Sequence, residues 1–166
     1  MGIFSIIKED IKANQSNTKG KFIVVFFRWV SYFASKRKNV LLIIPGLFFR
    51  VIYKFLIQWI MGIDLPEGTK IGKGLCIFHG QGLVVNGDAV FGDFVTLRHN
   101  TTIGNKFAGG KSPVFGNNID IGANSVIIGE VSVGNNVVIG AGTVVTKNIP
   151  DGSVVVGNPG RLINKE

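Results

Sequence analysis

The 166-residue chain holds two histidines, His79 and His99, and a single cysteine, Cys76. Imidazole exchanges protons close to neutral pH, so the two histidines are the first residues to consider for acid–base chemistry. One cysteine excludes both an intramolecular disulfide and a cysteine-rich metal site, and we expect Cys76 to be a buried packing residue. Two histidines are also too few for a three-histidine metal site, so we expect no metal.

Both histidines lie within a six-residue repeat. Residues 115–150 divide without a gap into six hexapeptides, which begin with an aliphatic residue or Phe, usually followed by Gly, and carry a small or β-branched residue at the fifth position. The same register continues upstream through Phe91-Gly92, Leu97-Arg98 and Ile103-Gly104. A period of six predicts a parallel β-helix.

In such a β-helix each hexapeptide makes one short strand and one corner, and three of them form a coil of about 18 residues. First-position side chains are expected to point inward and to stack on the next coil at the strand spacing of about 4.8 Å. Gly or Asn at the corners tolerates the backbone angles of a tight turn. Stability comes from stacking between neighbouring coils, because one hexapeptide buries almost nothing by itself.

The repeat is interrupted next to His79. Ile77 and Val85 are eight residues apart instead of six, so about two extra residues bulge out at positions 80–83. A departure from the structural rule of a repeat is expected at a functional site. The slip therefore marks His79 as a candidate functional residue.

His99 is expected beside His79. Both are third in their repeat units and His99 follows one whole coil later, so the two should lie on one face about 4.8 Å apart. Together with Arg98 and Asn100, His99 would form a polar patch that can bind a sugar or a phosphate. The alternative is that His99 is a solvent-facing residue of its coil.

The excess positive charge lies in the N-terminal third. Residues 1–62 hold ten Lys and Arg but only two acids, a net charge of +8, whereas residues 63–166 hold eight of each and are neutral. A nucleic-acid-binding protein more often carries this charge on its folded domain, so we expect no nucleic acid partner. We therefore divide the chain into a helical, basic segment, 1–62, and a β-helix domain, 63–166.

Two apolar stretches predict helices in the basic segment. They cover residues 22–34 and 40–61 and are separated by the basic run 35–39. Residues 1–21 are polar and lack the apolar core of a cleavable signal peptide. We expect the protein in the cytoplasm, at the inner face of the bacterial plasma membrane.

The second apolar stretch has the length of a membrane span, but its composition argues against one. Pro45 interrupts it, and Arg50, Lys54 and Gln58 follow one another every four residues. On a helix these three form one polar stripe surrounded by apolar side chains. We expect this helix to lie on a membrane surface with its cations near anionic head groups. Packing against the β-helix or within an oligomer, and a true span, are the alternatives.

Six short motifs within residues 63–163 carry a resemblance to a known family. They are Ile63-Asp64-Leu65-Pro66, Ile71-Gly72-Lys73-Gly74, His79-Gly80-Gln81-Gly82-Leu83-Val84-Val85, Thr101-Thr102-Ile103-Gly104-Asn105-Lys106, Gly109-Gly110-Lys111 and Gly157-Asn158-Pro159-Gly160-Arg161. Together they resemble the core of the serine acetyltransferases, which are hexapeptide-repeat acyltransferases with a left-handed β-helix. The expected fold is therefore mainly β: a left-handed parallel β-helix preceded by an apolar, basic α-helical segment.

The resemblance also implies a catalytic pair. In that family a histidine is the general base that takes the proton from the acceptor hydroxyl, and residue matching assigns this role to His79. Asp64 matches the aspartate that orients the histidine, and a carboxylate on the second ring nitrogen fixes the tautomer and stabilises the imidazolium. The alternatives are a structural histidine at the bulge and an aspartate that forms a turn next to Pro66.

Two departures from the serine acetyltransferase pattern bear on the acceptor. Phe78 stands where that family has an aspartate that helps to hold the amino acid, and Lys111-Ser112-Pro113 stands where it has Arg-His-Pro. The run 97–105 looks more like the colanic-acid and capsular polysaccharide O-acetyltransferases. We expect a hydroxyl of a glycan or of a nucleotide- or lipid-linked sugar as acceptor; serine, or a non-catalytic β-helix, is the alternative. The expected substrate-binding residues are Phe78, Arg98, His99 and Asn100.

The donor implied by the resemblance is acetyl-CoA. Relatives bind its pantetheine arm between adjacent subunits, along small residues of successive coils, so we expect a homotrimer with active sites at the subunit interfaces. The expected cofactor-binding residues are Gly104, Asn105, Lys106, Gly122, Ala123, Gly140, Ala141 and Arg161. Lys106, Lys111 or Arg161 would meet the CoA phosphates. The alternatives are corner glycines and solvated loop cations.

Overall fold

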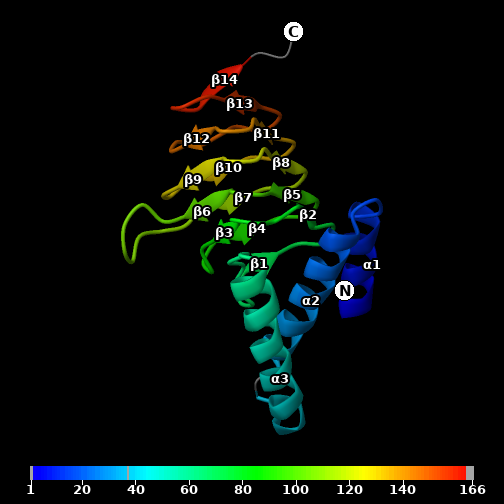
Figure 1. Cartoon of the computed structure of the whole chain (residues 1–166). Helices are drawn as coiled ribbons and strands as arrows, with labels where there is room; N and C mark the ends of the chain where they lie inside the picture. Colours follow the sequence, from blue (N-terminus) through cyan, green and yellow to red (C-terminus); the bar gives the residue numbers. More distant parts are fainter. Residues whose placement is uncertain (1, 37, 164–166) are drawn as a thin grey trace.

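The computed structural model describes residues 2–36 and 38–163, and shows a stack of short strands above a group of helices (Figure 1). The strands are β1 (Lys70–Ile71), β2 (Cys76–Phe78), β3 (Val84–Val85), β4 (Val90–Phe91), β5 (Val95–Arg98), β6 (Thr102–Gly104), β7 (Val114–Phe115), β8 (Ile119–Ile121), β9 (Val126–Ile128), β10 (Ser132–Val133), β11 (Val138–Ile139), β12 (Val144–Val145), β13 (Val154–Val156) and β14 (Arg161–Ile163). They form three faces: face 1 (β1-β4-β7-β10), face 2 (β2-β5-β8-β11-β13-β14) and face 3 (β3-β6-β9-β12). All pairs are parallel except β13–β14, so the predicted parallel β-helix is confirmed.

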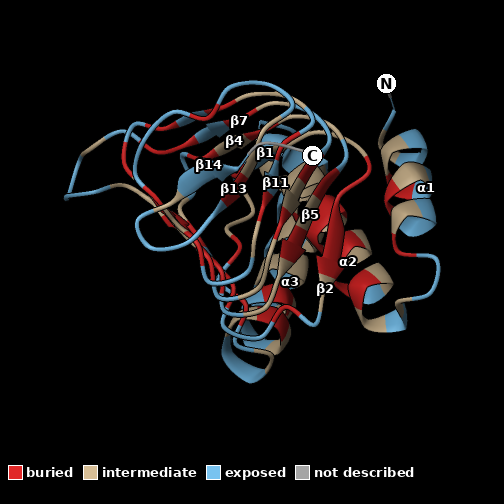
Figure 2. Cartoon of the chain, turned by 90° about the horizontal axis from the view of Figure 1, so that it is seen from above, coloured by how far each residue is buried: buried red, intermediate tan, exposed pale blue. Residues whose placement is uncertain are grey.

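The core consists of the first-position side chains predicted from the repeat. Leu97, Ile103 and Ile121 are at most 1% exposed. Phe91 pairs in register with Phe115, and their rings stack with centroids 4.7 Å apart. Figure 2, seen from above, shows the buried residues lining the inside of the coils. The stacking of first positions is therefore the main source of stability in this domain.

Five helical elements precede the strands. They are α1 (Ile3–Ala13), α2 (Thr18–Ser35), the short 3-10 turn η1 (Val40–Leu42), α3 (Ile43–Tyr53) and the π-helical η2 (Lys54–Ile60). The helices predicted over 22–34 and 40–61 are confirmed. Helix α1 was not expected, because residues 1–21 contain many polar side chains.

Those polar side chains of α1 and its following turn complete the first coil. Asn14 donates from Nδ2 to the carbonyl of Leu75 (2.8 Å) and accepts from the amide of Ile77 (3.2 Å). Asn17 donates to the carbonyl of Ile77 (2.7 Å), and the Asp10 carboxylate accepts from the amide of Leu75 (3.0 Å). These bonds satisfy the edge strand of face 2, which a preceding coil would otherwise pair.

A buried ion pair joins the two helices beside this edge. The Arg28 guanidinium donates to Asp10 (2.6 Å) and to the carbonyls of Ile71 (2.7 Å) and Gly72. Burial raises the pKa of the Asp10 carboxyl, while Arg28 acts in the opposite direction. Helix α2 crosses β2 at Gly20. The crossing is so close that a Cβ added there would lie 2.7 Å from the carbonyl oxygen of Ile77. Packing on the β-helix therefore accounts for α1 and α2.

Helices α3 and η2 contact the first coil along one side. Tyr53 donates to the carbonyl of Leu65 (2.7 Å), and the Arg50 guanidinium pairs with Glu67 (2.9 Å). Arg50 was expected near lipid head groups; instead its charge is neutralised within the protein. Among the described residues, Val40–Ile60 is one helical stretch with the length and mean hydropathy (2.1) of a membrane span, and 11% of its most apolar window is buried.

Candidate active site

His79 lies in a bulged corner between β2 and β3. Phe78 pairs with Arg98, and Val84 pairs with Thr102. The chain therefore takes six residues from Phe78 to Val84, but only four from Arg98 to Thr102 at the same corner of the next coil. The two extra residues predicted from the repeat are therefore confirmed. The bulge bends sharply: His79, Gly80 and Gly82 all have positive φ angles, of 66°, 74° and 67°.

At His79 the backbone has the left-handed conformation that asparagine residues adopt at other corners. Asn100, Asn118, Asn124 and Asn136 have φ angles between 53° and 60°, close to the 66° of His79. Asparagine and histidine both adopt this left-handed region more readily than most residues, and Phe94 also occupies it, with a φ angle of 58°. The His79 side chain is exposed, so the bulge presents an imidazole to the surface instead of packing it.

His99 lies next to His79, as expected. Strands β2 and β5 pair directly, and the two imidazole rings meet edge to face with centroids 5.7 Å apart. His99 is half-buried, and its Nδ1 atom is covered but has no hydrogen-bond partner among the described residues. A buried polar atom without a partner is uncommon and marks a place where another group can bond. The pair therefore forms a polar corner with unused hydrogen-bonding capacity.

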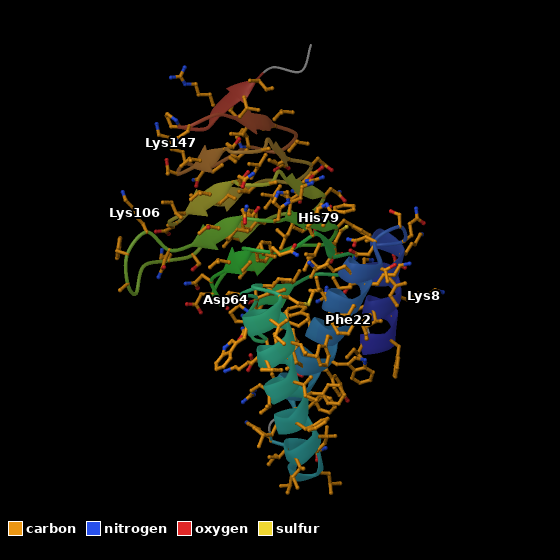
Figure 3. All side chains as sticks on the ribbon, viewed as in Figure 1. Lys8, Phe22, Asp64, His79, Lys106 and Lys147 are labelled. Carbon is orange, nitrogen blue, oxygen red and sulfur yellow. The ribbon has the colours of Figure 1, made fainter. Side chains whose placement is uncertain are left out.

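Asp64 lies on the segment directly beneath the bulge. It bridges to Val84 in parallel, while the amide of Gly82 bonds to the carbonyl of Gly62 (2.8 Å). The exposed Asp64 carboxylate accepts a bond from Gln58 (3.3 Å) and has no direct hydrogen bond to His79 in the described chain. Figure 3 labels both side chains and shows them apart. The orienting role of Asp64 stays a prediction.

Phe78 and Arg98 form the wall beside the histidines. The Arg98 guanidinium lies 5.7 Å from the centre of the Phe78 ring, forms an ion pair with Asp120 and donates to the carbonyl of Ile121 (2.9 Å). Asp120 was not among the predicted site residues, although an acid one coil beyond Arg98 was a signal for it. A ligand of Arg98 must therefore compete with Asp120.

Small residues continue the histidine corner into later coils. The amide of Asn124 bonds to the carbonyl of His99 (3.1 Å), and the amide of Gly142 to that of Ala123 (2.8 Å). This register places Ala123 and then Ala141 in line with His99. The glycines beside them serve packing, since a Cβ at Gly122 would lie 2.3 Å from the amide nitrogen of Ala141 and one at Gly140 2.8 Å from Val156.

A second group of predicted residues lies at another corner. Gly104 and Asn105 lead out of β6 into the excursion 105–113, which Figure 3 shows with Lys106 protruding from the stack. Two hollows of about 240 and 320 Å³ adjoin there and share Thr146; we call them the loop-side groove. The first contains Lys106 and Lys111, the second contains Arg161 and also Lys147, a cation the sequence analysis missed.

The two corners are separated by face 3. The histidine corner precedes β6 in the chain and the loop-side groove follows it, so one copy does not bring Lys106 and His79 together. Asn100 stays with the histidines, where its exposed side chain donates to Asn124 (3.1 Å). The expected cofactor-binding residues thus divide into a small-residue column next to His99 and a cationic groove one corner further on.

The remaining reactive groups do not extend the site. Cys76 is 4% exposed, and burial raises the pKa of its thiol to about 11, as expected for a packing residue. Within residues 2–36 and 38–163 no three His, Cys, Asp or Glu side chains gather as metal ligands would. The two adjacent imidazoles offer proton transfer at the histidine corner.

Comparison with known proteins shows that the chain is similar to acetyltransferases. No protein-family model matches the chain. It is 36% identical over 128 residues to an Escherichia coli (strain K12) protein that carries the name colanic acid biosynthesis acetyltransferase WcaB, covering 75% of this chain and 78% of that protein. It is 40% identical over 80 residues to the serine acetyltransferase of Helicobacter pylori (strain ATCC 700392 / 26695), covering 47% of each.

The fold is shared with a solved enzyme. The crystal structure of Neisseria gonorrhoeae serine acetyltransferase superimposes with a TM-score of 0.81 at 25% identity, and the match covers 98% of this chain and 65% of that one. Because nearly the whole chain is covered, the shared fold includes the helices α1–α3 as well as the strands. The left-handed β-helix expected from the sequence is thereby confirmed.

Proposed function

This chain belongs to the hexapeptide-repeat acetyltransferases, and from that premise we propose that it transfers the acetyl group of acetyl-CoA to a hydroxyl of a sugar in a polysaccharide or lipid-linked glycan. The observation that carries the proposal is the bulged corner that presents the exposed imidazole of His79 beside His99. The exposed imidazole is not packed into the core and lies beside a second imidazole, which supports a chemical role for His79.

His79 would act as the general base. As the acceptor oxygen attacks the thioester carbonyl, the imidazole takes the hydroxyl proton, and the tetrahedral intermediate then expels CoA as thiolate. The same proton passes to the thiolate, so the products are an acetyl ester and CoA thiol. Such base catalysis contributes about 10² to 10⁴ in rate. His99 meets the His79 ring edge to face and would help to orient the base.

Acetyl-CoA would bind along the small residues and the cations. Ala123 and Ala141 continue the histidine corner and leave room for an extended pantetheine arm, while Lys106, Lys147 and Arg161 line hollows suited to phosphates. These two surfaces lie at different corners of one copy. A complete donor site therefore needs the histidine corner of one copy and the loop-side groove of another, which supports the homotrimer implied by the family resemblance.

The choice of a sugar acceptor rests on relatives and on Phe78. The protein named for colanic acid biosynthesis is matched over 78% of its length, whereas the Helicobacter pylori enzyme is matched over 47%. Phe78 stands where the serine enzymes have an aspartate, and its ring is covered by Arg98. Serine is the second candidate, because the fold is shared with a serine acetyltransferase over 98% of this chain.

The acceptor is tested by following CoA release from acetyl-CoA with serine and, separately, with a panel of nucleotide-linked and lipid-linked sugars. We expect turnover with a sugar and none with serine. Turnover with serine alone would replace the sugar proposal by the amino-acid enzyme. No turnover, and no acetyl-CoA-dependent rise in melting temperature, would contradict acetyl transfer altogether, because a ligand at a hundred times its Kd stabilises by about 2.7 kcal/mol.

The shared site is tested by mixing two inactive variants. His79→Asn removes the base, and Lys106→Glu with Arg161→Glu reverses the charge of the loop-side groove. If one copy supplies the histidine and another the groove, mixed assemblies regain activity at the interfaces that combine the two intact surfaces. Mixtures that stay inactive, although light scattering shows that subunits have exchanged, would place both surfaces of each site in one copy.

A further inference from the structure

The helices that lead into the β-helix expose an apolar stripe. Leu41, Ile44, Phe48, Val51, Phe55 and Trp59 follow one another at steps of three or four residues and are between 54% and 85% exposed. This spacing places all six on one side of the continuous η1–α3–η2 helix. We call these six residues the arm face. Single exposed apolar side chains are normal, but a contiguous row of this length marks an interaction surface.

The opposite side of the same helix already has its partners. Tyr53 and Ile57 are fully buried, Tyr53 bonds to the carbonyl of Leu65, and Arg50 pairs with Glu67. Gly46 brings the helix close to α2, since a Cβ there would lie 3.1 Å from the Cβ of Phe33. This side of the helix, with Arg50 of the polar stripe, thus serves the β-helix, and the apolar stripe is left outside.

The segment that carries the arm face has an excess of positive charge. Residues 11–63 contain no Asp or Glu. Lys36 and Lys38 are exposed just before the arm and Lys54 is exposed on it, and no described acid forms an ion pair with them. An apolar stripe bordered by free lysines is complementary to anionic lipid head groups above an acyl layer.

We propose that the arm face docks on the surface of an anionic lipid bilayer. The helix lies in one leaflet and does not cross the membrane, because Tyr53 and Arg50 attach its C-terminal half to the first coil and lipid cannot surround it. Pairing of two arm faces from different copies is disfavoured, since it would bring together two segments of net positive charge. Docking is independent of acetyl transfer, and it would hold the proposed site near lipid-linked acceptors.

The test measures binding of the full chain to vesicles of phosphatidylcholine with and without phosphatidylglycerol, at low and high salt. The test variant is Leu41→Ser/Ile44→Ser/Phe48→Ser, whose three side chains support no buried contact of the first coil. The matched control is Val138→Ser, which removes an apolar side chain exposed on face 2 of the β-helix. Circular dichroism checks that each variant is folded.

We expect the wild-type chain and Val138→Ser to bind vesicles that contain phosphatidylglycerol and the triple variant to bind at least about tenfold less. Lys36→Gln/Lys38→Gln should weaken binding by about fivefold per cation and reduce its dependence on salt. The emission of Trp59, isolated in a Trp29→Phe variant because the chain has two tryptophans, should shift to shorter wavelength with anionic vesicles.

Three outcomes would overturn the proposal. The first is that the wild-type chain binds neither kind of vesicle. The second is that the folded triple variant binds as well as the wild type. The third is that light scattering finds an assembly of the wild-type chain that the triple variant cannot form, while vesicle binding is unchanged; the arm face would then contact a second copy. None of these outcomes bears on CoA release, so failure here is distinct from failure of the proposed activity.

Discussion

The β-helix and the η1–α3–η2 arm are both rich in aliphatic side chains. The β-helix buries them inside its coils, whereas the arm exposes many of them on its surface. Ile103 and Ile121 point into the coils and are at most 1% exposed, whereas Leu41 and Ile44 on the arm are more than 80% exposed. In the β-helix each first-position side chain has an equivalent position one coil away to stack on. The arm has no such repeat, so its apolar row needs a partner from outside the fold.

Helices α1 and α2 stand between these two extremes. They cover the outside of the first coil (Figure 2) with buried apolar side chains of α2, such as Ile23 and Phe27, and with polar groups. Asp10, Asn14 and Asn17 bond to backbone groups of residues 75–77, and Arg28 closes the arrangement. A parallel β-helix has open strand edges at its ends, and here the N-terminal edge is closed by side chains. The comparison therefore separates a cap, which we expect to be required for stability, from the arm face, which we expect not to be.

Removing the carboxylate at the centre of the cap should have the largest effect on stability. Asp10→Ala leaves Arg28 buried without its counter-charge and the amide of Leu75 without its acceptor, so the free energy of unfolding should fall by about 3–5 kcal/mol. Urea unfolding measures it, with Glu9→Ala on the same helix as the control. A loss below about 1 kcal/mol would mean that the cap is dispensable.

Truncating a core side chain should lower the free energy of unfolding slightly less than Asp10→Ala does. Ile121→Ala removes a first-position side chain that is 0% exposed, and should destabilise by about 2–5 kcal/mol through lost burial and the cavity left behind. Val138→Ala, on the outer side of a neighbouring strand, is the matched control and should change little. Equal losses for both would show that the repeat position does not decide burial in solution.

Disturbing the close crossing of α2 over the first coil should have a smaller effect on the free energy of unfolding. A methyl group at Gly20 would meet the carbonyl oxygen of Ile77 and the side chains of Asn14 and Asn17, so Gly20→Ala should destabilise by about 1–3 kcal/mol. Gly68→Ala is the control, since a Cβ there has no atom within 4 Å. Comparable melting temperatures for the two variants would argue that the cap is loosely held.

The arm face should be the least sensitive region of all. Leu41→Ser changes a side chain that is 85% exposed, and its effect on the free energy of unfolding should stay within about 0.5 kcal/mol. Thermal unfolding in the absence of lipid measures this. A loss like that of Ile121→Ala would mean that the arm packs against protein in solution, and the contrast between the two regions would disappear.

The parts predicted from the sequence are those with a local or periodic cause. The hexapeptide register fixed which side chains point inward, and counting eight residues from Ile77 to Val85 located the bulge that the strand pairing confirms. The same count placed His99 beside His79, and their ring centroids are 5.7 Å apart. A period of six carries this information because every coil repeats it.

The parts that were missed depend on partners far away in the sequence. Helix α1 looked polar because Asp10 and Asn14 serve strand β2, more than 60 residues later. Arg50 was expected near lipid head groups because no nearby feature of the sequence indicates its ion pair with Glu67. The catalytic roles of His79 and Asp64 remain predictions, since hydrogen bonds within one copy do not test them.

The proposed chemistry is tested most directly by the rate of CoA release in His79→Asn, measured with the acceptor that the wild-type chain acetylates. Asparagine occupies the same backbone conformation at Asn100 and Asn124, so the bulge should keep its shape and the melting temperature should not change. His99→Asn is the control, because it removes the neighbouring imidazole and leaves the base. We expect kcat to fall by about 10²- to 10⁴-fold in His79→Asn and by much less in His99→Asn. Turnover near that of the wild type in a folded His79→Asn variant would contradict the role of His79 as general base.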